Sequence, residues 1–359
     1  MTTVHVVVPA GVGDPSRPSG GNTYDRTVCA GLSGRGWDVR QREVPGRWPR
    51  ADAAARAKLA AVLTGIPDGS LVLLDGLVAC AVPEVLVPER RRLRLVVVVH
   101  LPLGHDPVLG EGAAEGAVRR ERERAVLHAA VAVVATSAWT RAWLLTAYRL
   151  APDRVCVVAP GVDPAHLMPG CEPGLHLLCV GVVSAAKGHD VLLAALADVA
   201  DLEWTCRCVG SVAVDPAFAS RVRARAGATG LTDRVTFTGP RVGEDLATVY
   251  AAADLVLAPS RTESYGMVVT EALARGVPVV GSDVGGLPEA LGRARGGRRP
   301  GILVAPGDPA ALAAALDRWL TDAGVRRDLR LAARARRATL ADWTHTTDRL
   351  SGVLSVVAR

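Results

Sequence analysis

Short apolar runs alternate with stretches of helical pattern along the whole chain. The runs that we expect to form strands occupy residues 4–8, 71–74, 95–99, 131–135 and 155–158, and then residues 175–182, 204–209, 235–238, 255–258, 277–281 and 302–304. Such nearly continuous apolar runs are typical of strands that helices cover on both faces, as in parallel sheets. The alternation therefore predicts an α/β protein with right-handed crossover connections.

A Pro- and Gly-rich segment at residues 161–174, GVDPAHLMPGCEPG, interrupts this alternation and is typical of a linker. A chain of 359 residues is long enough for about two domains. We therefore expect two Rossmann-like, doubly wound parallel-sheet domains, at residues 1–160 and 175–342. A final helix is predicted to begin after Asp342 and to fill residues 343–359.

Ligands of doubly wound sheets bind at the carboxyl ends of the strands, so we expect the site in a cleft between the two sheets. Several glycines and polar residues stand in the loops that follow the expected strands. They are Gly20, Gly21 and Asn22 after the first run, His100 after residues 95–99, Lys187 after residues 175–182, and Glu263 after residues 255–258.

The segment PSRTESYGMVVTEAL at residues 259–273 predicts a turn and then a helix over residues 267–275. The backbone N–H groups at that turn are expected to be unpaired, and these belong to Tyr265, Gly266, Met267 and Val268. Unpaired N–H groups and the helix dipole favour an anion such as a diphosphate at a helix start. Gly266 lets the backbone approach such an anion closely.

Two glutamates, Glu263 and Glu271, stand in this segment with seven residues between them. The predicted helix around Glu271 is otherwise apolar, and a buried carboxylate is costly without partners. Its two oxygens could accept hydrogen bonds from a vicinal diol such as a ribose. Glu263 precedes the turn, where we expect it to meet a sugar beyond the phosphates; a solvated loop glutamate is the alternative interpretation.

Residues 250–260, YAAADLVLAPS, lead into this segment, and residues 276–286, GVPVVGSDVGG, follow it. Together they resemble the donor-site signature of retaining glycosyltransferases of family four, whose two-domain fold is called GT-B. The resemblance implies retaining transfer of a sugar from a nucleoside-diphosphate sugar, frequently a UDP-sugar in that family, to an acceptor hydroxyl. It also implies that the first domain binds the acceptor, that no cofactor is used, and that the last helix crosses back to the first domain. The identity of the acceptor is not readable from the residues.

The resemblance gives Lys187 the family's Lys-Gly position, where the ammonium group binds a phosphate oxygen. The chain has only one other lysine, Lys58, against an abundance of arginine. The family's usual arginine five residues earlier is replaced here by Val182, and Arg241 is the candidate substitute. A surface lysine at a helix start is the alternative interpretation of Lys187.

His100 matches the family's histidine that hydrogen-bonds the donor sugar and aligns its anomeric carbon; the alternative is a strand-end histidine that caps backbone groups. Gly20, Gly21 and Asn22 are expected in the loop before a helix over residues 23–32, where their amides would bind the second phosphate.

Two other classes of enzyme remain as alternatives. A nucleotide-sugar epimerase or hydrolase of the same fold would need no acceptor. An NAD-dependent oxidoreductase would also have parallel sheets, but Gly11 and Gly13 are followed neither by a third glycine nor by a helix, so the dinucleotide fingerprint fails.

Composition and charge bear on which classes of partner we expect. The formal charge is +6, but the arginine runs fall in helical patterns and aromatic residues make up only 4% of the chain, which does not favour nucleic-acid binding. No apolar run reaches the ~18–20 residues of a membrane span, and the N-terminus has no basic leader, so we expect a soluble cytoplasmic protein.

The seven cysteines include no Cys-x-x-Cys pair and are expected to be reduced. No Asp-x-Asp pair occurs, so a metal-independent reaction is expected.

Overall fold

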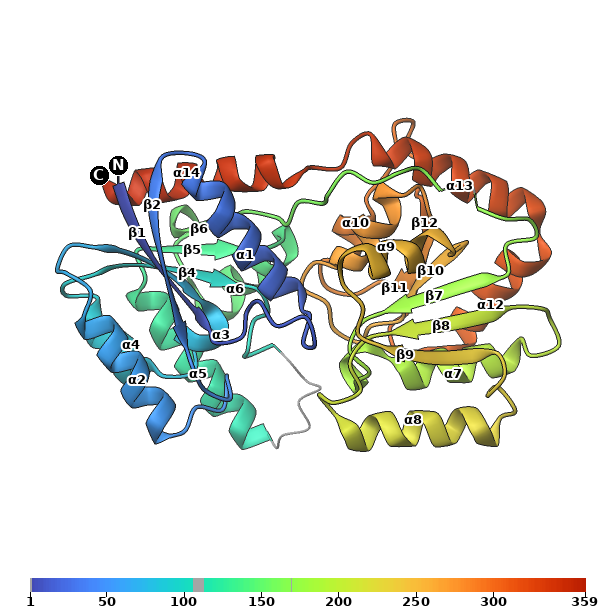
Figure 1. Ribbon diagram of the computed structural model, residues 1–359, viewed down its shortest axis with the longest axis horizontal. Coiled ribbons are helices and arrows are strands. Elements are labelled where there is room, and N and C mark those ends of the chain that lie inside the picture. Colours follow the sequence, from blue (N-terminus) through green and yellow to red (C-terminus); the bar gives the residue numbers. More distant parts are fainter. Residues whose placement is uncertain (1, 106–112, 169) are drawn as a thin grey trace. The chain divides into compact units, whose positions relative to one another are not determined.

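The computed structural model describes residues 2–105, 113–168 and 170–359, and the chain forms two compact units (Figure 1). Unit 1 consists of Met1–Asp14, Ser19–Gly161 and Ala341–Arg359, and unit 2 consists of Pro15–Pro18 and Val162–Leu340. The chain therefore leaves unit 1 after Gly161 and returns to it after Leu340.

Unit 1 contains a six-stranded parallel sheet in the order β2-β1-β3-β4-β5-β6. Its strands are β1 (Thr2–Pro9), β2 (Trp37–Val44), β3 (Leu71–Asp75), β4 (Arg94–Val99), β5 (Ala132–Ala135) and β6 (Val155–Val157). Its helices are α1 (Gly20–Ser33), α2 (Ala53–Thr64), α3 (Gly76–Ala79), α4 (Pro83–Glu89), α5 (Ala113–Ala129), α6 (Ala138–Tyr148) and α14 (Trp343–Ala358), with a 3₁₀ turn at Pro152–Arg154.

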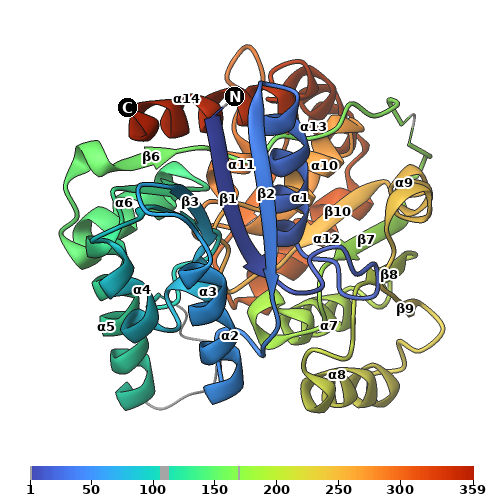
Figure 2. The same ribbon diagram turned by 60° about the vertical axis from the view of Figure 1, so that its left-hand side comes forward.

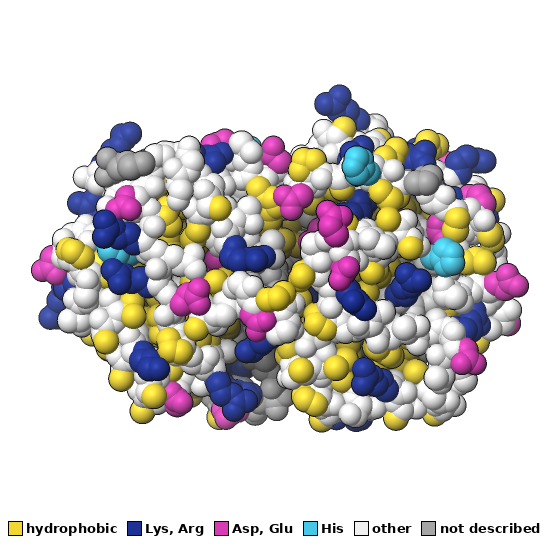
Figure 3. All heavy atoms as spheres, viewed as in Figure 1, with side chains coloured by type: hydrophobic (Ala, Val, Ile, Leu, Met, Phe, Trp, Pro, Cys, Tyr) yellow, Lys and Arg dark blue, Asp and Glu magenta, His cyan; other side chains and the backbone are white. Residues whose placement is uncertain are grey.

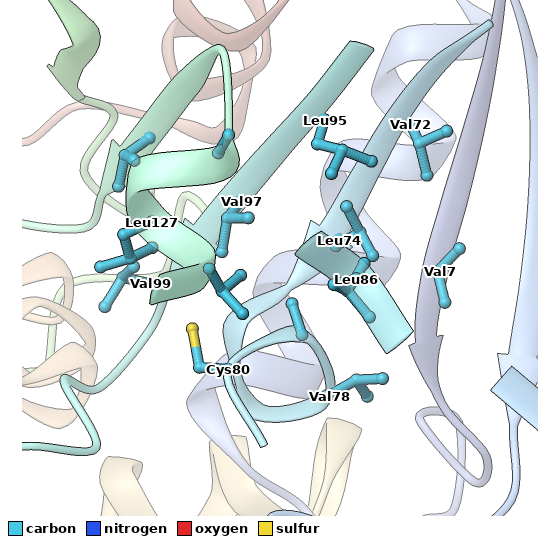
Figure 4. Close-up of a cluster of buried hydrophobic side chains, with 14 of the residues drawn as sticks. Val7, Val72, Leu74, Val78, Cys80, Leu86, Leu95, Val97, Val99 and Leu127 are labelled. Atoms are coloured by element: carbon cyan, nitrogen blue, oxygen red, sulfur yellow. The ribbon is translucent and has the colours of Figure 1, made fainter. Parts of the chain in front are cut away.

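Alternate residues of the central strands build the core on one face of this sheet. Val97 and Val99 of β4 join Leu74 of β3 in a cluster with Leu86 of α4 and Leu127 of α5 (Figure 4). The intervening residues of β4 are also buried, on the opposite face. Burial on both faces explains why these strands are apolar at nearly every position.

The strand β2 was not predicted from the sequence. It pairs with β1 alone, at the edge of the sheet (Figure 2). Its sequence WDVRQREV is buried at Trp37 and Val44, while most positions between them are partly or fully exposed. An edge strand that faces solvent carries polar side chains, so the apolar run that reveals a central strand is missing here.

The helix α1 begins at Gly20, three residues before its predicted start at residue 23. The prediction that Gly20, Gly21 and Asn22 lie in a loop is therefore wrong, because they form the first turn of α1. Ser19 is the N-cap residue, and its hydroxyl accepts a hydrogen bond of 3.1 Å from the N–H of Asn22. A serine N-cap stabilises a helix start that two glycines would otherwise disfavour.

The last helix, α14, follows its N-cap Asp342 and packs against α1 within unit 1. A Cβ atom at Gly31 of α1 would lie 2.6 Å from the hydroxyl oxygen of Thr347, so only glycine permits this close helix contact. The hydroxyl of Thr346 also donates a 2.9 Å hydrogen bond to the carbonyl of Ala159. None of the helices in the described part of the chain combines the length and the apolar character that crossing a membrane requires.

Unit 2 contains a second six-stranded parallel sheet, in the order β12-β11-β10-β7-β8-β9. Its strands are β7 (His176–Val180), β8 (Thr205–Val209), β9 (Val235–Gly239), β10 (Leu255–Ala258), β11 (Val279–Ser282) and β12 (Gly301–Val304). Its helices are α7 (His189–Asp198), α8 (Pro216–Ala228), α9 (Gly243–Ala251), α10 (Met267–Ala274), α11 (Leu287–Leu291), α12 (Pro309–Thr321) and α13 (Ala323–Arg337), with a 3₁₀ turn at Ala185–Lys187. The predicted α/β architecture with two parallel sheets is confirmed.

Each face of this second sheet has its own apolar layer. Leu177 and Cys179 of β7 pack on one side with residues of α7, α8 and α12, among them the fully buried Trp319. Leu178, between them in sequence, packs on the other side with α10 and α11. Each of the seven cysteines is a free thiol, and five of them are buried.

A buried carboxylate joins the first strand of unit 2 to the centre of its sheet. Asp254, directly before β10, accepts hydrogen bonds from the backbone N–H groups of Cys171 (2.7 Å) and His176 (3.0 Å). A guanidinium nitrogen of Arg330 lies 3.4 Å from the same carboxylate. Asp254 is only 3% exposed, so its charge depends on these donors.

We expect Asp254→Ala to lower the free energy of unfolding by about 2–4 kcal/mol, because it leaves buried N–H groups and an arginine without their acceptor. Thermal and urea unfolding, followed by circular dichroism, measure the change. The control is Asp201→Ala, which alters an exposed aspartate of the same unit and should change stability by less than about 0.5 kcal/mol. Equal effects in the two variants would contradict the role given to Asp254.

Candidate active site

Lys187 and Glu263 form an ion pair in unit 2. The Nζ atom of Lys187 lies 2.6 Å from Oε2 of Glu263. Lys187 ends the 3₁₀ turn that follows β7, and Glu263 lies in the loop after β10. Because β7 and β10 are neighbouring parallel strands, their carboxyl ends lie side by side and bring these residues together across 76 positions of sequence.

Arg261 fastens these two loops to each other. Its backbone N–H donates to the carbonyl of Ala186 (2.8 Å), and its guanidinium donates to the carbonyl of Ala185 (2.9 Å). The same guanidinium binds both oxygens of Asp190, at 2.7 and 2.8 Å. A bidentate pair of this kind fixes orientation as well as distance. Sequence analysis did not identify Arg261 or Asp190, because their partnership is visible only in the folded chain.

Gly188 permits the close approach of the two loops. Its φ is +69°, and a Cβ atom there would lie 2.0 Å from the carbonyl oxygen of Pro259. Both the left-handed backbone and the lack of space therefore require glycine at this position. The Lys-Gly pair thus combines a cation with the residue that lets its loop dock.

The remaining contacts hold Glu263 in place. Its carbonyl accepts a 2.9 Å hydrogen bond from the N–H of Gly286, and the hydroxyl of Ser260 lies 3.4 Å from Oε2. The side chain of Glu263 is 11% exposed and that of Lys187 is 31% exposed. An ammonium group has three N–H donors, so Lys187 can bind Glu263 and still offer donors to a ligand.

The helix α10 begins shortly after Glu263 in the sequence. Gly266 is its N-cap with a φ of +102°, and no side chain caps the first turn. Tyr265, Gly266, Met267 and Val268 surround this start, as the sequence predicted. A helix N-terminus that lacks a side-chain cap is suited to an anion.

Glu271 lies in the second turn of α10, where Tyr250 holds it. The hydroxyl of Tyr250, which is fully buried, donates a 2.7 Å hydrogen bond to Oε2 of Glu271. Burial raises the pKa of Glu271, while this hydrogen bond and the charge of Arg275 oppose the rise. Oε1 of Glu271 is not used by Tyr250 and is available to another donor.

Arg241, a further candidate in unit 2, has a different charged partner. Arg241 has Asp245 as its charged partner, at 3.9 Å, and its side chain is 43% exposed. Within the described residues, no ion pair links Arg241 with Glu263 or Glu271. Its role as a substitute for an arginine at Val182 stays a prediction.

His100 lies in unit 1, immediately after β4. Its Nε2 atom is 2.9 Å from Oδ1 of Asp25 in α1. A Cβ atom on Gly21 would lie 3.3 Å from the imidazole ring, so Gly21 lets the ring pack against the first turn of α1. The ring of Tyr24 meets the imidazole edge-on, with 5.1 Å between the centroids. Sequence analysis found His100 but not its partner Asp25.

Two groups among the described residues have the composition of metal ligands. Cys171, His176 and Asp254 form the first, but the oxygens of Asp254 already accept backbone N–H groups. Asp25, Asp75 and His100 form the second. The Asp25–His100 distance of 2.9 Å is that of a hydrogen bond.

Charge is mixed on the face of the molecule shown in Figure 3, where basic and acidic side chains are interspersed. Mixed charge of this kind fits solvated helix faces and does not form the basic stripe of a nucleic-acid interface.

Comparison with known proteins identifies the family. The family model "Glycosyltransferase Family 4" matches residues 3–166, and the model "Glycosyl transferases group 1" matches residues 174–322. A D-inositol 3-phosphate glycosyltransferase of Catenulispora acidiphila is 35% identical over 291 residues, which cover 75% of this chain and 68% of that protein. The chain belongs to glycosyltransferase family 4.

Other relatives of this family 4 chain match over a smaller part of their length. D-inositol 3-phosphate glycosyltransferases of Stackebrandtia nassauensis and Acidothermus cellulolyticus are 36% and 35% identical, over 58% and 68% of this chain. The matched chain spans only 50% and 58% of those two relatives.

Solved structures show the fold. A sucrose-phosphate synthase from Thermosynechococcus elongatus matches with a TM-score of 0.81 at 24% identity, over 98% of both chains. HepE of Anabaena, in complex with UDP-glucose, matches with a TM-score of 0.77 at 19% identity, over 99% of this chain and 100% of that chain. The predicted GT-B fold is confirmed.

We expect Tyr250→Phe to raise the pKa of Glu271 further, because the variant removes a hydrogen bond that stabilises the carboxylate. Carboxyl ¹³C NMR of the Glu271 side chain measures this change. The control is Tyr148→Phe, which removes a similar tyrosine–glutamate bond, to Glu123 in unit 1. An unchanged pKa of Glu271 in Tyr250→Phe would show that the hydroxyl does not support the carboxylate.

Proposed function

We propose that this chain transfers a glycosyl group from a nucleoside-diphosphate sugar to an acceptor hydroxyl, with retention of anomeric configuration. The observation that carries the proposal is the Lys187–Glu263 pair of 2.6 Å beside the uncapped start of α10. Membership of family 4 supports the same reaction class.

The diphosphate would bind between Lys187 and the first turn of α10. Lys187 supplies a compact positive charge, and Glu263 keeps it from extending into solvent. The backbone N–H groups near Gly266 supply further hydrogen-bond donors to the diphosphate, so no additional side chain has to lose its water. With Val182 in place of the family's usual arginine, Lys187 carries a larger share of this charge stabilisation.

The nucleoside would bind through its ribose. Tyr250 occupies Oε2 of Glu271, which leaves Oε1 to accept a hydrogen bond from the ribose diol. A partly buried carboxylate is a strong acceptor in such a place, because little water competes for it. We take the carrier to be UDP, and His100 to contact the donor sugar.

The reaction breaks the bond between the anomeric carbon and the diphosphate oxygen, and the electron pair leaves with the diphosphate. The acceptor hydroxyl attacks the oxocarbenium-like sugar from the same face, and the departing phosphate oxygen takes its proton. The protein contributes positioning and stabilisation of the leaving charge. No protein nucleophile is required.

The relatives suggest which acceptor to test first. Several are named D-inositol 3-phosphate glycosyltransferases. We therefore propose a phosphorylated cyclic polyol as the acceptor class for this chain.

The experiment is incubation of the protein with UDP-, GDP- and ADP-sugars and D-inositol 3-phosphate, with and without a metal chelator. Mass spectrometry identifies the products, and ¹H NMR coupling constants give the anomeric configuration. We expect an α-linked product from an α-linked donor, at an unchanged rate in chelator. Free sugar or an epimer without acceptor product would favour the hydrolase or epimerase interpretation, and loss of turnover in chelator would contradict metal independence.

We expect Lys187→Ala and Glu263→Ala each to lower kcat/KM by ~10²-fold or more, which corresponds to about 2.7 kcal/mol. Lys187→Ala removes the positive charge that stabilises the leaving diphosphate, and Glu263→Ala removes the carboxylate that holds that charge in place. Steady-state kinetics, with whichever sugar nucleotide of the donor panel supports transfer, measures the change.

The controls are Lys58→Ala, at the chain's other lysine, and Glu203→Ala; both residues are exposed. Both controls should retain wild-type kinetics. Wild-type kcat/KM in either site variant would remove that residue from the mechanism.

A further inference from the structure

Three polar groups of unit 1 meet near the carboxyl ends of β3 and β4. They are the carboxyls of Asp25 and Asp75 and the imidazole of His100, and one polar atom from each lies within 4.8 Å of the others. Asp25 and Asp75 are each only 5% exposed. The binding roles given above to Lys187 and Glu271 do not account for this cluster.

The cluster has two carboxyls but one basic group. Within the described residues, neither carboxyl forms an ion pair with a lysine or arginine. Two carboxylates and one imidazolium would bury a net negative charge, which is costly in a site of low polarity. One proton between the two carboxyls makes the cluster neutral.

A buried oxygen of Asp25 that lacks a partner points to the same proton. Oδ2 of Asp25 is buried and receives no hydrogen bond from a backbone or side-chain N–H group. One oxygen of the Asp75 carboxyl belongs to the same cluster, within 4.8 Å of the polar atoms of Asp25 and His100. Two carboxyls can form a hydrogen bond only if one of them is protonated.

The surroundings indicate where the protons reside. Burial and the charge of Asp25 raise the pKa of Asp75. Burial alone would lower the pKa of His100, but the charge and hydrogen bond of Asp25 outweigh it and raise this pKa to about 9. Among the described residues, Tyr24, Cys29 and Cys80 also lie near these carboxyls, and burial raises the pKa of each, so they stay uncharged.

We propose that Asp75 holds a proton shared with Asp25, and that Asp25 keeps His100 as an imidazolium whose second nitrogen, Nδ1, donates a hydrogen bond to the bound ligand. His100 then acts as a charged donor and not as a base. Asp25 and Asp75 are positioning residues, since they act through His100. The identity of the ligand as the donor sugar rests on the proposed function, whereas the charge state of His100 does not.

The test is imidazole ¹⁵N NMR of the full chain between pH 6 and 10, with the His100 signals assigned among the eight histidines by their loss in His100→Gln. We expect the wild-type signals to show two protonated nitrogens well above pH 6.5, the ordinary pKa of histidine. Asp25→Asn should lower the pKa of His100 by about one pH unit or more, because it removes the carboxylate. Asp75→Asn should lower it by less than Asp25→Asn does, because Asp75 raises the pKa of His100 through charge alone, whereas Asp25 also forms the hydrogen bond to Nε2.

Stability supplies a readout that does not depend on a ligand. Since the folded pKa of His100, about 9, exceeds its ordinary 6.5, its contribution to stability is complete below pH 6.5 and is lost as pH rises through 9. The melting temperature of the wild type should therefore fall towards that of His100→Gln over this range.

Three results would overturn the proposal. They are titration of wild-type His100 near pH 6.5, an equal fall in its pKa in Asp75→Asn and Asp25→Asn, and replacement of its Nε2–H signal by a metal-bound signal when Zn²⁺ is added. The pH profile of glycosyl transfer tests the function separately. In Asp25→Asn, kcat/KM should fall with pH in a range where the wild type stays constant; if no donor is turned over, the proposed function fails while NMR still decides the charge of His100.

Discussion

The contact between the loops after β7 and β10 is the constraint on which the candidate site depends. The 2.6 Å pair of Lys187 and Glu263 exists only because the two loops dock, and Gly188 and Arg261 make that docking possible. Parallel strands place the loops side by side, but the backbone of one loop must still come within hydrogen-bond distance of the other. The contacts between the two loops therefore restrict the positions that both side chains can take.

Both units contain buried or partly buried carboxyl groups, and three of these carboxyls differ in the kind of partner they have. Asp254 accepts backbone N–H groups, Glu271 accepts a tyrosine hydroxyl, and Asp25 binds an imidazole. Backbone donors fasten a loop and leave no capacity for a ligand. The single side-chain donor of Glu271 leaves its second oxygen free to bind a ligand. Asp254 therefore serves stability, whereas Glu271 is suited to ligand recognition.

Most of the fold could be predicted because the central strands are buried on both faces, and burial leaves a readable apolar run. The edge strand β2 was missed for the same reason, since its exposed residues between Trp37 and Val44 are polar. The motif residues Lys187, Glu263 and Glu271 were readable from local sequence. Their supporting partners were not, because Asp25 and His100 lie 75 positions apart and Tyr250 and Glu271 lie 21 apart, and nothing in the local pattern marks either pair.

The scarcity of lysine has a practical consequence for chemical labelling. Apart from the terminal amine, reagents that acylate amines can modify only Lys58, which is exposed on α2, and Lys187, which is held against a carboxylate. The exposed lysine provides an internal reference within the same molecule. The ratio of acylation at the two positions therefore reports directly on whether the Nζ atom of Lys187 is engaged, without any engineered probe.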